Sequence, residues 1–460
     1  MATATRWKAT AWWDLRESAG PQAERGFRGK ALTAEPTGLQ RAPLWKELRQ
    51  AAQQMRRILS DRADKPGSSA SLTSAETDLL YGGLRHWGLT QIRLERMAKR
   101  KPDPVLAMLL SVVFGALRRS YRPPALLVSQ AVQAAQSWSG VPGARFVNAI
   151  LRQTLSDPLS AAQDMHHPTA RWNAPTWWIE AMHESLGERT AHWLDHQQRH
   201  PPLTVRYMGP AEQRQAWIEA LCAQGLRPWS VGPALPRAFH IEPARSVTQL
   251  PGFSQGWFRV QDVSAQRCFG WLPLEAGQTV WDVCAAPGGK TFLAAEQAGV
   301  RIYASDASES RLNKLQAEWA RLNTQLAGTV SVQTFDPLAG SAWPAHWPDQ
   351  FDHLILDLPC SASGVVRRHP EIPWRRTPDQ LRAVSALQWD LLKAVWPRLR
   401  PGGEALLVTC SVFTREGEEL ARRWQNEPCH VERLTAPGLL LAEGERVGDG
   451  FFIARFRKRM

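Results

Sequence analysis

Hydrophobic residues follow a helical period in the N-terminal part of the chain. Between Leu44 and about Ser160 they recur every three or four positions, for example over residues 44–59 and 124–138. This spacing places them on one face of an α-helix, and prolines and glycines separate one such segment from the next. The pattern predicts an all-helical domain over residues 44–160.

The pattern changes in the C-terminal half to short apolar runs that alternate with helical segments. Runs at 278–285 and 351–359 are bounded by turn residues, and helical periods occupy 289–299 and 309–323. Strands that alternate with helices are typical of a doubly wound parallel sheet, which binds ligands beyond the carboxyl ends of its strands. We therefore predict an α/β, Rossmann-like domain over residues 250–460.

The remaining segments have weaker patterns. Residues 161–249 combine a helical period over 176–198 with a strand-like run at 201–208, which predicts a connecting α+β subdomain. Residues 1–43 show no clear period, and we expect them to be a flexible extension.

The longest apolar run, 104–117, is shorter than the roughly 20 residues that span a bilayer, so we expect a buried helix there.

Positive charge is concentrated in the helical part of the chain. Residues 1–160 contain 24 Lys and Arg against 12 Asp and Glu, whereas residues 161–460 contain 32 against 31. A basic balance of this kind suggests a polyanion as partner, and nucleic acid is the commonest one. A merely solubilising surface would give the same charge, so composition alone leaves both interpretations open.

The six cysteines are too few and too scattered for a disulfide framework, and none has the spacing of a zinc site. We expect reduced thiols and no bound metal. The N-terminus lacks the uninterrupted apolar core of a signal peptide, so we expect a cytoplasmic protein.

The glycine-rich turn 284–290, CAAPGGK, follows a predicted strand and opens a predicted helix. A phosphate-binding loop would need glycine where Cys284 stands. Gly288 and Gly289 let the backbone approach a ligand, and Asp306 ends the next predicted strand, where a carboxylate can accept hydrogen bonds from ribose hydroxyls. Because G-x-G-x-x-G is incomplete, the pattern favours S-adenosyl-L-methionine over a nicotinamide cofactor.

Two cysteines also lie at predicted strand ends. Asp357 precedes Cys360 by three residues, and Cys410 follows another strand. A thiolate that adds to C6 of cytosine makes C5 nucleophilic towards a methyl donor, and the second cysteine can assist product release. Asp357 and Lys290 can stabilise charge that develops on the ring. On this chemistry alone, either cysteine can be the nucleophile.

The motifs at 282–291, 357–374 and 408–412 resemble those of the Nop/Sun RNA 5-methylcytosine methyltransferases, and in particular the bacterial branch that acts on 16S rRNA. The helical part is similar to the NusB-like RNA-binding domain of that branch. The resemblance implies that Cys410 is the nucleophile and that Cys360 serves product release. It implies a cofactor site that consists of Cys284, Ala285, Ala286, Pro287, Gly288, Gly289, Lys290, Asp306, Asp336 and Asp357.

The sequence departs from the family pattern at two places. Leu358 stands where the family has a small residue, which should alter packing without removing a reactive group. The segment around Asp336 lacks the usual family form, and an aspartate in a surface turn is the competing interpretation.

Arg367, Arg368 and His369 follow the Cys360 motif closely, and we expect them to contact RNA phosphates, although a solvated loop would look the same. The sequence therefore predicts a monomeric 16S rRNA (cytosine-5-)-methyltransferase that uses S-adenosyl-L-methionine and acts on unassembled rRNA. The alternatives are the same chemistry on tRNA, and a non-catalytic RNA-binding ribosome-assembly factor.

Overall fold

The computed structural model describes residues 43–60, 72–119, 122–297, 299–427, 431–441 and 448–460. The extension predicted over residues 1–43 lies, except for residue 43, outside the described residues, as does Cys429. Residues 44–460 form one compact unit. The described helices include none that is both long and apolar enough to cross a membrane.

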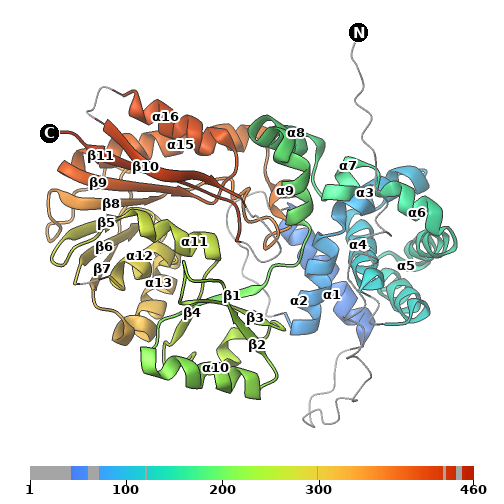
Figure 1. Cartoon of the computed structure of the whole chain (residues 1–460). Coiled ribbons are helices and arrows are strands. Elements are labelled where there is room, and N and C mark those ends of the chain that lie inside the picture. Colours follow the sequence, from blue (N-terminus) through green and yellow to red (C-terminus); the bar gives the residue numbers. More distant parts are fainter. Residues whose placement is uncertain (1–42, 61–71, 120–121, 298, 428–430, 442–447) are drawn as a thin grey trace. The chain divides into compact units, whose positions relative to one another are not determined.

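The N-terminal region is helical, as predicted (Figure 1). It comprises α1 (Leu44–Ser60), α2 (Ser74–Leu84), α3 (Trp87–Met97), α4 (Pro104–Arg118), α5 (Pro124–Ser156), α6 (Pro158–Asp164) and α7 (Pro168–Trp172). The apolar run is the central helix α4, which is buried without interruption from Val105 to Gly115. Asp103 caps α4 through the Val105 amide, and Pro104 occupies the first turn, where its missing N–H has no cost. The core of this region therefore forms around α4.

Helix boundaries differ from the sequence prediction where backbone torsions leave the helical region. Within the predicted helical domain, α2 and α3 are separate helices, because His86 between them has a φ of −114° and a ψ of 10°. In α5, Ser139 and Gly140 have non-helical torsions, with φ of 59° at Gly140, so two helices meet there at a kink.

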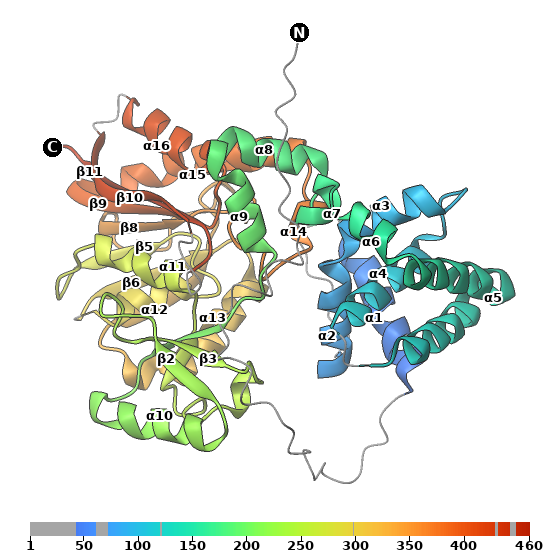
Figure 2. The ribbon, with the colours of Figure 1, turned by 45° about the vertical axis from the view of Figure 1, so that its right-hand side comes forward.

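The connecting region begins with helices and ends with a small sheet. The predicted helix 176–198 is divided into α8 (Thr176–Leu186) and α9 (Thr190–Gln197), because Gly187 adopts a φ of 56°. The antiparallel strands β1 (Leu203–Tyr207), β2 (Arg227–Ser230), β3 (Ala238–Glu242) and β4 (Phe258–Val260) have the order β2-β3-β1-β4. Figure 2 shows α10 (Arg214–Ala223) along this sheet, where Trp217 and Leu221 pack on β1 and β3.

The C-terminal region confirms the predicted α/β fold. Its strands are β5 (Thr279–Asp282), β6 (Arg301–Asp306), β7 (Thr329–Thr334), β8 (Phe351–Asp357), β9 (Leu399–Thr409), β10 (Val431–Leu440) and β11 (Phe451–Lys458). They form one sheet in the order β10-β11-β9-β8-β5-β6-β7. Strands β5 to β9 are parallel, whereas β11 is antiparallel to both of its neighbours.

Helices cover both faces of this sheet because alternate strand residues point to opposite sides. The helices are α11 (Val263–Arg267), α12 (Gly289–Ala295), α13 (Glu309–Leu322), α15 (Pro378–Val395) and α16 (Glu418–Gln425), whereas the short α14 (Ile372–Arg375) packs with α8 and α9. Val280 and Ile355 pack with residues of α12, whereas Trp281 packs in the cluster that contains α15 and α16. Figure 1 shows α12 and α13 on one face and α15 and α16 on the other.

Strand order locates the ligand crevice. From β5 the chain proceeds outward to β6 and β7, and then returns to the other side of β5 for β8 and β9. Such a reversal leaves a crevice beyond the carboxyl ends of the strands. The segments that begin at Cys284, Pro359 and Cys410 follow β5, β8 and β9 respectively, so they meet at this edge.

Candidate active site

The loop after β5 has a shape that only glycine permits at its last position. Gly288, which precedes α12, has a φ of 94°, and a Cβ there would lie 2.5 Å from the Phe292 ring. Arg259 in β4 donates to the carbonyls of Pro287 and Gly288 at 2.9 and 3.0 Å. The small sheet therefore holds the loop from outside, a contact that sequence reasoning did not single out.

Asp306 lies at the end of β6 and is 1% exposed. Its Oδ1 accepts from the Ser308 amide at 2.8 Å and from Arg311 at 2.6 Å. Its Oδ2 has no hydrogen-bond partner among the described residues. A buried carboxylate oxygen in this state fits an acceptor for ribose hydroxyls, and β6 is adjacent to the strand that carries the glycine loop.

The other predicted cofactor residues have different environments. Burial, together with the nearby Asp306 and Asp282, raises the pKa of the Cys284 thiol well above its usual range, so this cysteine is a neutral lining group. Asp336 follows β7 and accepts from the Leu338 amide at 2.9 Å, which closes its own turn. Its contact with a cofactor stays a prediction.

Lys290 and Asp357 form an ion pair between the first turn of α12 and the end of β8, with 2.6 Å between Nζ and Oδ2. Burial disfavours the ammonium, but Asp357 together with the nearby Cys268 and Cys410 raises the pKa of Lys290. From the sequence we expected Asp357 and Lys290 to act separately on the cytosine ring. In the structure the two side chains form an ion pair.

The two candidate cysteines are in contact. The Sγ atoms of Cys360 and Cys410 are 3.3 Å apart, and both side chains are partly exposed. The hydrogen bond between the two thiols, followed by burial, raises the pKa of Cys360. Cys410 also interacts electrostatically with Lys290. All four predicted catalytic residues thus meet at the edge of the sheet where β5, β8 and β9 end.

Arg367 and Arg368 are engaged inside the protein. Arg367 is 3% exposed and contacts Asp449 at 2.5 Å, while Arg368 contacts Asp449 at 2.6 Å and Asp262 at 2.8 Å. The predicted phosphate contacts would have to compete with these carboxylates. His369 is about half exposed, and its ring lies 3.3 Å from Glu371.

The arginines instead join three segments distant in sequence. Asp262 also accepts from the Asp449 amide at 2.9 Å, and Ser264 donates to the Asp449 carbonyl at 2.7 Å. Sequence reasoning gave neither aspartate a role, although the segments that contain them, 250–268 and 449–458, also resemble the family.

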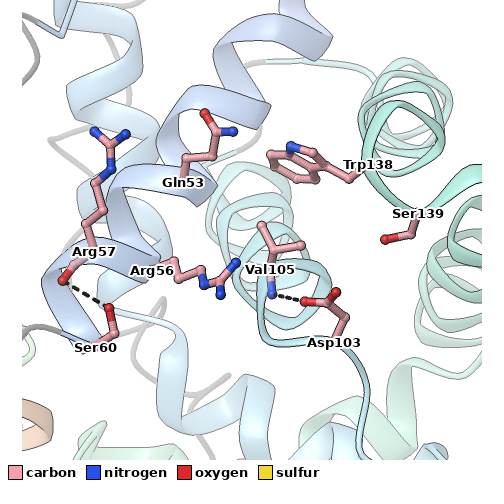
Figure 3. Close-up of a pocket in the computed structure, with 8 residues that line it drawn as sticks. All are labelled: Gln53, Arg56, Arg57, Ser60, Asp103, Val105, Trp138 and Ser139. Carbon is pink, nitrogen blue, oxygen red and sulfur yellow. Dashed lines mark hydrogen bonds between the residues drawn. The ribbon is translucent and has the colours of Figure 1, made fainter.

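A hollow lies in the helical region, between α1, the start of α4 and the kink of α5. It encloses about 470 Å³ (Figure 3). The residues that line it are Gln53, Arg56, Arg57, Ser60, Asp103, Val105, Trp138 and Ser139. Both arginines are exposed, and no ion pair to either of them is found within the described residues.

Across the described ranges, no three His, Cys, Asp or Glu side chains are grouped as metal ligands would be.

The chain is similar to known RNA methyltransferases in sequence. The family model of 16S rRNA methyltransferase RsmB/F matches residues 269–457. Ribosomal RNA small subunit methyltransferase B of Salmonella arizonae is 32% identical over 393 residues, which cover 83% of this chain and 90% of that protein. The enzyme of the same name from Erwinia tasmaniensis is 35% identical over 319 residues, covering 68% and 73%.

Solved structures show the same fold. The crystal structure of PH0851 superposes with a TM-score of 0.70 at 22% identity, and covers 91% of this chain and 100% of that one. NSun6 from Pyrococcus horikoshii, solved with the S-adenosylmethionine analogue SFG, gives a TM-score of 0.52 at 19% identity, over 62% and 98%.

Proposed function

We propose that this chain, which belongs to the RsmB/F family of 16S rRNA methyltransferases, methylates C5 of a cytosine in 16S rRNA through a covalent bond between Cys410 and C6 of that base. As a member of the family, the chain is an enzyme that uses S-adenosyl-L-methionine and has RNA as its substrate. The 3.3 Å contact between Cys360 and Cys410, at the strand ends that also carry Lys290 and Asp357, is the observation that carries the proposal.

The cofactor fits the loops after β5 and β6. Gly288, with a φ of 94°, forms the tight turn between β5 and α12, and the unpartnered oxygen of Asp306 can accept from the cofactor's ribose. When bound, S-adenosyl-L-methionine supplies an electrophilic methyl group. Asp336, at the end of β7, is the proposed contact to the adenine side.

The protein's part in the reaction is to activate and then release the base. The Cys410 thiolate adds to C6, which breaks the C5–C6 double bond and makes C5 nucleophilic. The Lys290 ammonium, held by Asp357 at 2.6 Å, stabilises negative charge that develops on the ring. After methylation, transfer of the C5 proton to water restores the C5–C6 double bond and expels the Cys410 thiolate. Cys360 lies beside that sulfur and is placed to assist this last step.

The helical region is proposed to grip RNA backbone, as a NusB-like domain would. Its excess of positive charge supports this, and the hollow with Arg56, Arg57 and Trp138 combines cations with an aromatic surface. Because the target base must leave its stack, at a cost of a few kcal/mol, unassembled rRNA is the proposed substrate. The proposed enzyme is a monomer in the cytoplasm.

The roles of the two cysteines are separable by substitution. Cys410→Ala should abolish methyl transfer to 16S rRNA and leave cofactor binding intact. Cys360→Ala should accumulate a covalent protein–RNA adduct, since addition proceeds and release does not. The measurements are transfer of labelled methyl groups and a denaturing gel for the adduct. If the adduct formed in Cys410→Ala but not in Cys360→Ala, Cys360 would be the nucleophile and Cys410 would serve release.

The substrate is tested independently by bisulfite sequencing of rRNA and tRNA from cells with and without the gene. One cytosine of 16S rRNA should lose its methyl group on deletion. If only tRNA lost a methyl group, the substrate of the same reaction would be tRNA. If neither RNA lost a methyl group and the protein transferred none in vitro, it would be a non-catalytic assembly factor.

A further inference from the structure

A buried carboxylate lies behind both cysteine loops. Glu416 ends the 3-10 turn Thr414–Glu416, which follows the Cys410 segment, and it is 1% exposed. The acidic run around it, REGEE at 415–419, has the composition of a solvated surface. The structure instead points this one side chain inward.

The carboxylate binds the residue that follows each cysteine. Its Oε1 accepts from the Ser361 amide at 2.9 Å, and its Oε2 accepts from the Ser361 hydroxyl at 2.6 Å. The Ser411 hydroxyl lies 3.2 Å from the Ser361 hydroxyl and also hydrogen-bonds to the carboxylate. Each Cys-Ser pair is therefore anchored at its serine.

Further hydrogen bonds join the same two loops. The Ser363 hydroxyl lies 2.9 Å from that of Ser411 and accepts from the Val412 amide at 2.9 Å. The Gly364 amide donates to the Cys410 carbonyl at 2.9 Å. The Thr409 hydroxyl donates to the Glu416 carbonyl at 3.3 Å. Glu416 thus contacts the Cys410 loop through its backbone carbonyl and its side chain, and the Cys360 loop through its side chain.

The loop after Cys360 also needs such an anchor. Ala362 has a φ of 62°, a left-handed conformation that residues with a Cβ adopt at a cost. Burial raises the pKa of Glu416, and the hydrogen bonds from Ser361 and Ser411 act against that effect. A carboxylate offers two acceptor oxygens to these donors, whereas an amide offers one acceptor and adds donors of its own.

We propose that Glu416 is a positioning residue that holds Cys360 beside Cys410 and so permits release of the methylated base. The inference rests on the proposed function, because it assumes an adduct on Cys410 and its resolution by Cys360. Loss of the carboxylate removes the anchor at Ser361 and one hydrogen bond to Ser411, but the backbone pairing of β9 and the hydrogen bond to the Cys410 carbonyl do not depend on it. Addition and methylation should then continue, while release becomes slow.

Glu416→Gln in the full chain tests this directly. Its matched control is Glu419→Gln, an exposed position three residues further on. We expect Glu416→Gln to lower turnover on 16S rRNA about tenfold, as for loss of hydrogen bonds to a charged group, and to accumulate the covalent adduct. Affinity for S-adenosyl-L-methionine, measured by calorimetry, should match that of Glu419→Gln.

Ser361→Ala is the second variant, because it removes a donor to Glu416 and retains the carboxylate. It should accumulate the adduct as well. If Glu416→Gln does not fold, this variant alone tests whether the contact between Glu416 and Ser361 is needed for release. Normal turnover in both variants would overturn the inference. So would slow turnover with weakened cofactor binding and no adduct, since that is the result of general destabilisation.

Failure of this inference is distinct from failure of the proposed function. If Cys360→Ala traps an adduct and Glu416→Gln behaves as the control does, only the role of Glu416 is wrong. If neither wild type nor Cys360→Ala forms an adduct with RNA, the covalent mechanism itself is wrong.

Discussion

Asp282 shows how a single buried carboxyl makes stability depend on pH. It ends β5, is fully buried, and accepts from the Thr291 hydroxyl at 2.6 Å. Burial raises its pKa from 3.8 to about 7. The folded state therefore favours the protonated form, so the stability that this group contributes is complete below about pH 4 and is lost as pH rises through about 7.

Asp282→Asn should remove that dependence, because an amide keeps the acceptor for Thr291 and does not ionise. Between pH 5 and pH 8 the wild type should lose about 2 to 3 kcal/mol of unfolding free energy from this group, and the variant should lose none of it. Urea unfolding at both pH values measures the difference. Asp390→Asn, at an exposed position in α15, is the control. An equal pH dependence in Asp282→Asn and wild type would contradict the assignment.

At the residue scale, the sequence predicted which side chains gather at the strand ends and did not predict how they pair. Cys360, Cys410, Lys290 and Asp357 follow strands of one parallel sheet, so their convergence follows from topology. Their ion pair and thiol contact depend on side-chain conformation, which no local pattern encodes. Arg367 and its partner Asp449 are 82 positions apart, a separation over which periodicity says nothing.

At the scale of elements, backbone contact between loops positions the cysteines. The Gly450 amide donates to the Gly364 carbonyl at 2.9 Å. A Cβ on Gly364 would lie 1.9 Å from the Gly450 carbonyl oxygen and 2.9 Å from that of Cys410. Glycine is required at this position because three chain segments meet there.

Gly364→Ala should therefore force the segment before β11 away from the cysteine loops. We expect a loss of about 1 to 3 kcal/mol of unfolding free energy, the usual range for overpacking, and a larger relative loss of methyl transfer. Gly270→Ala is the matched control, since a Cβ there meets no atom within 4 Å. Calorimetric unfolding and turnover are measured for both. Unchanged turnover in Gly364→Ala would show that the contact does not position Cys410.

The sequence predicted helices correctly where the hydrophobic period was long. It failed where a glycine ended a helix or where a distant strand determined the pairing. Helices α1, α4 and α13 lie close to their predicted ranges because each has an uninterrupted apolar face. The predicted helix 176–198 was wrong as a single helix, because Gly187 takes a left-handed turn. The pairing of β11 between β9 and β10 depends on contacts that the sequence does not display.

At the scale of the whole molecule, charge is divided between regions with different tasks. The excess of positive charge lies within residues 1–160, whereas the α/β region is nearly balanced. Arginines of the α/β region such as Arg367 are bound to carboxylates. The excess charge that favours a polyanion partner therefore lies within residues 1–160 and not in the α/β region.

Affinity for 16S rRNA should accordingly fall steeply with salt, as phosphate neutralisation releases counterions. Replacing both Arg56 and Arg57 by Gln should lower the slope of log affinity against log salt by about two, one for each phosphate that is no longer neutralised. The control replaces Arg382 and Arg422, which are exposed on α15 and α16. Filter binding over a salt series measures all three proteins. Equal slopes for the two variants would remove the hollow on α1 from the RNA-binding surface.

The place of β11 has a consequence for biosynthesis. The strand that carries Cys410 at its end, β9, is hydrogen-bonded on one side to β8 and on the other to β11, which follows it by more than forty residues. While a ribosome is making this chain, β9 stays unpaired on that side until residues 451–458 have emerged from the exit tunnel. The pairing of β9 with β11 therefore forms only after that point, and a frameshift between Cys410 and β11 would leave β9 as an edge strand even though both Cys360 and Cys410 had been translated.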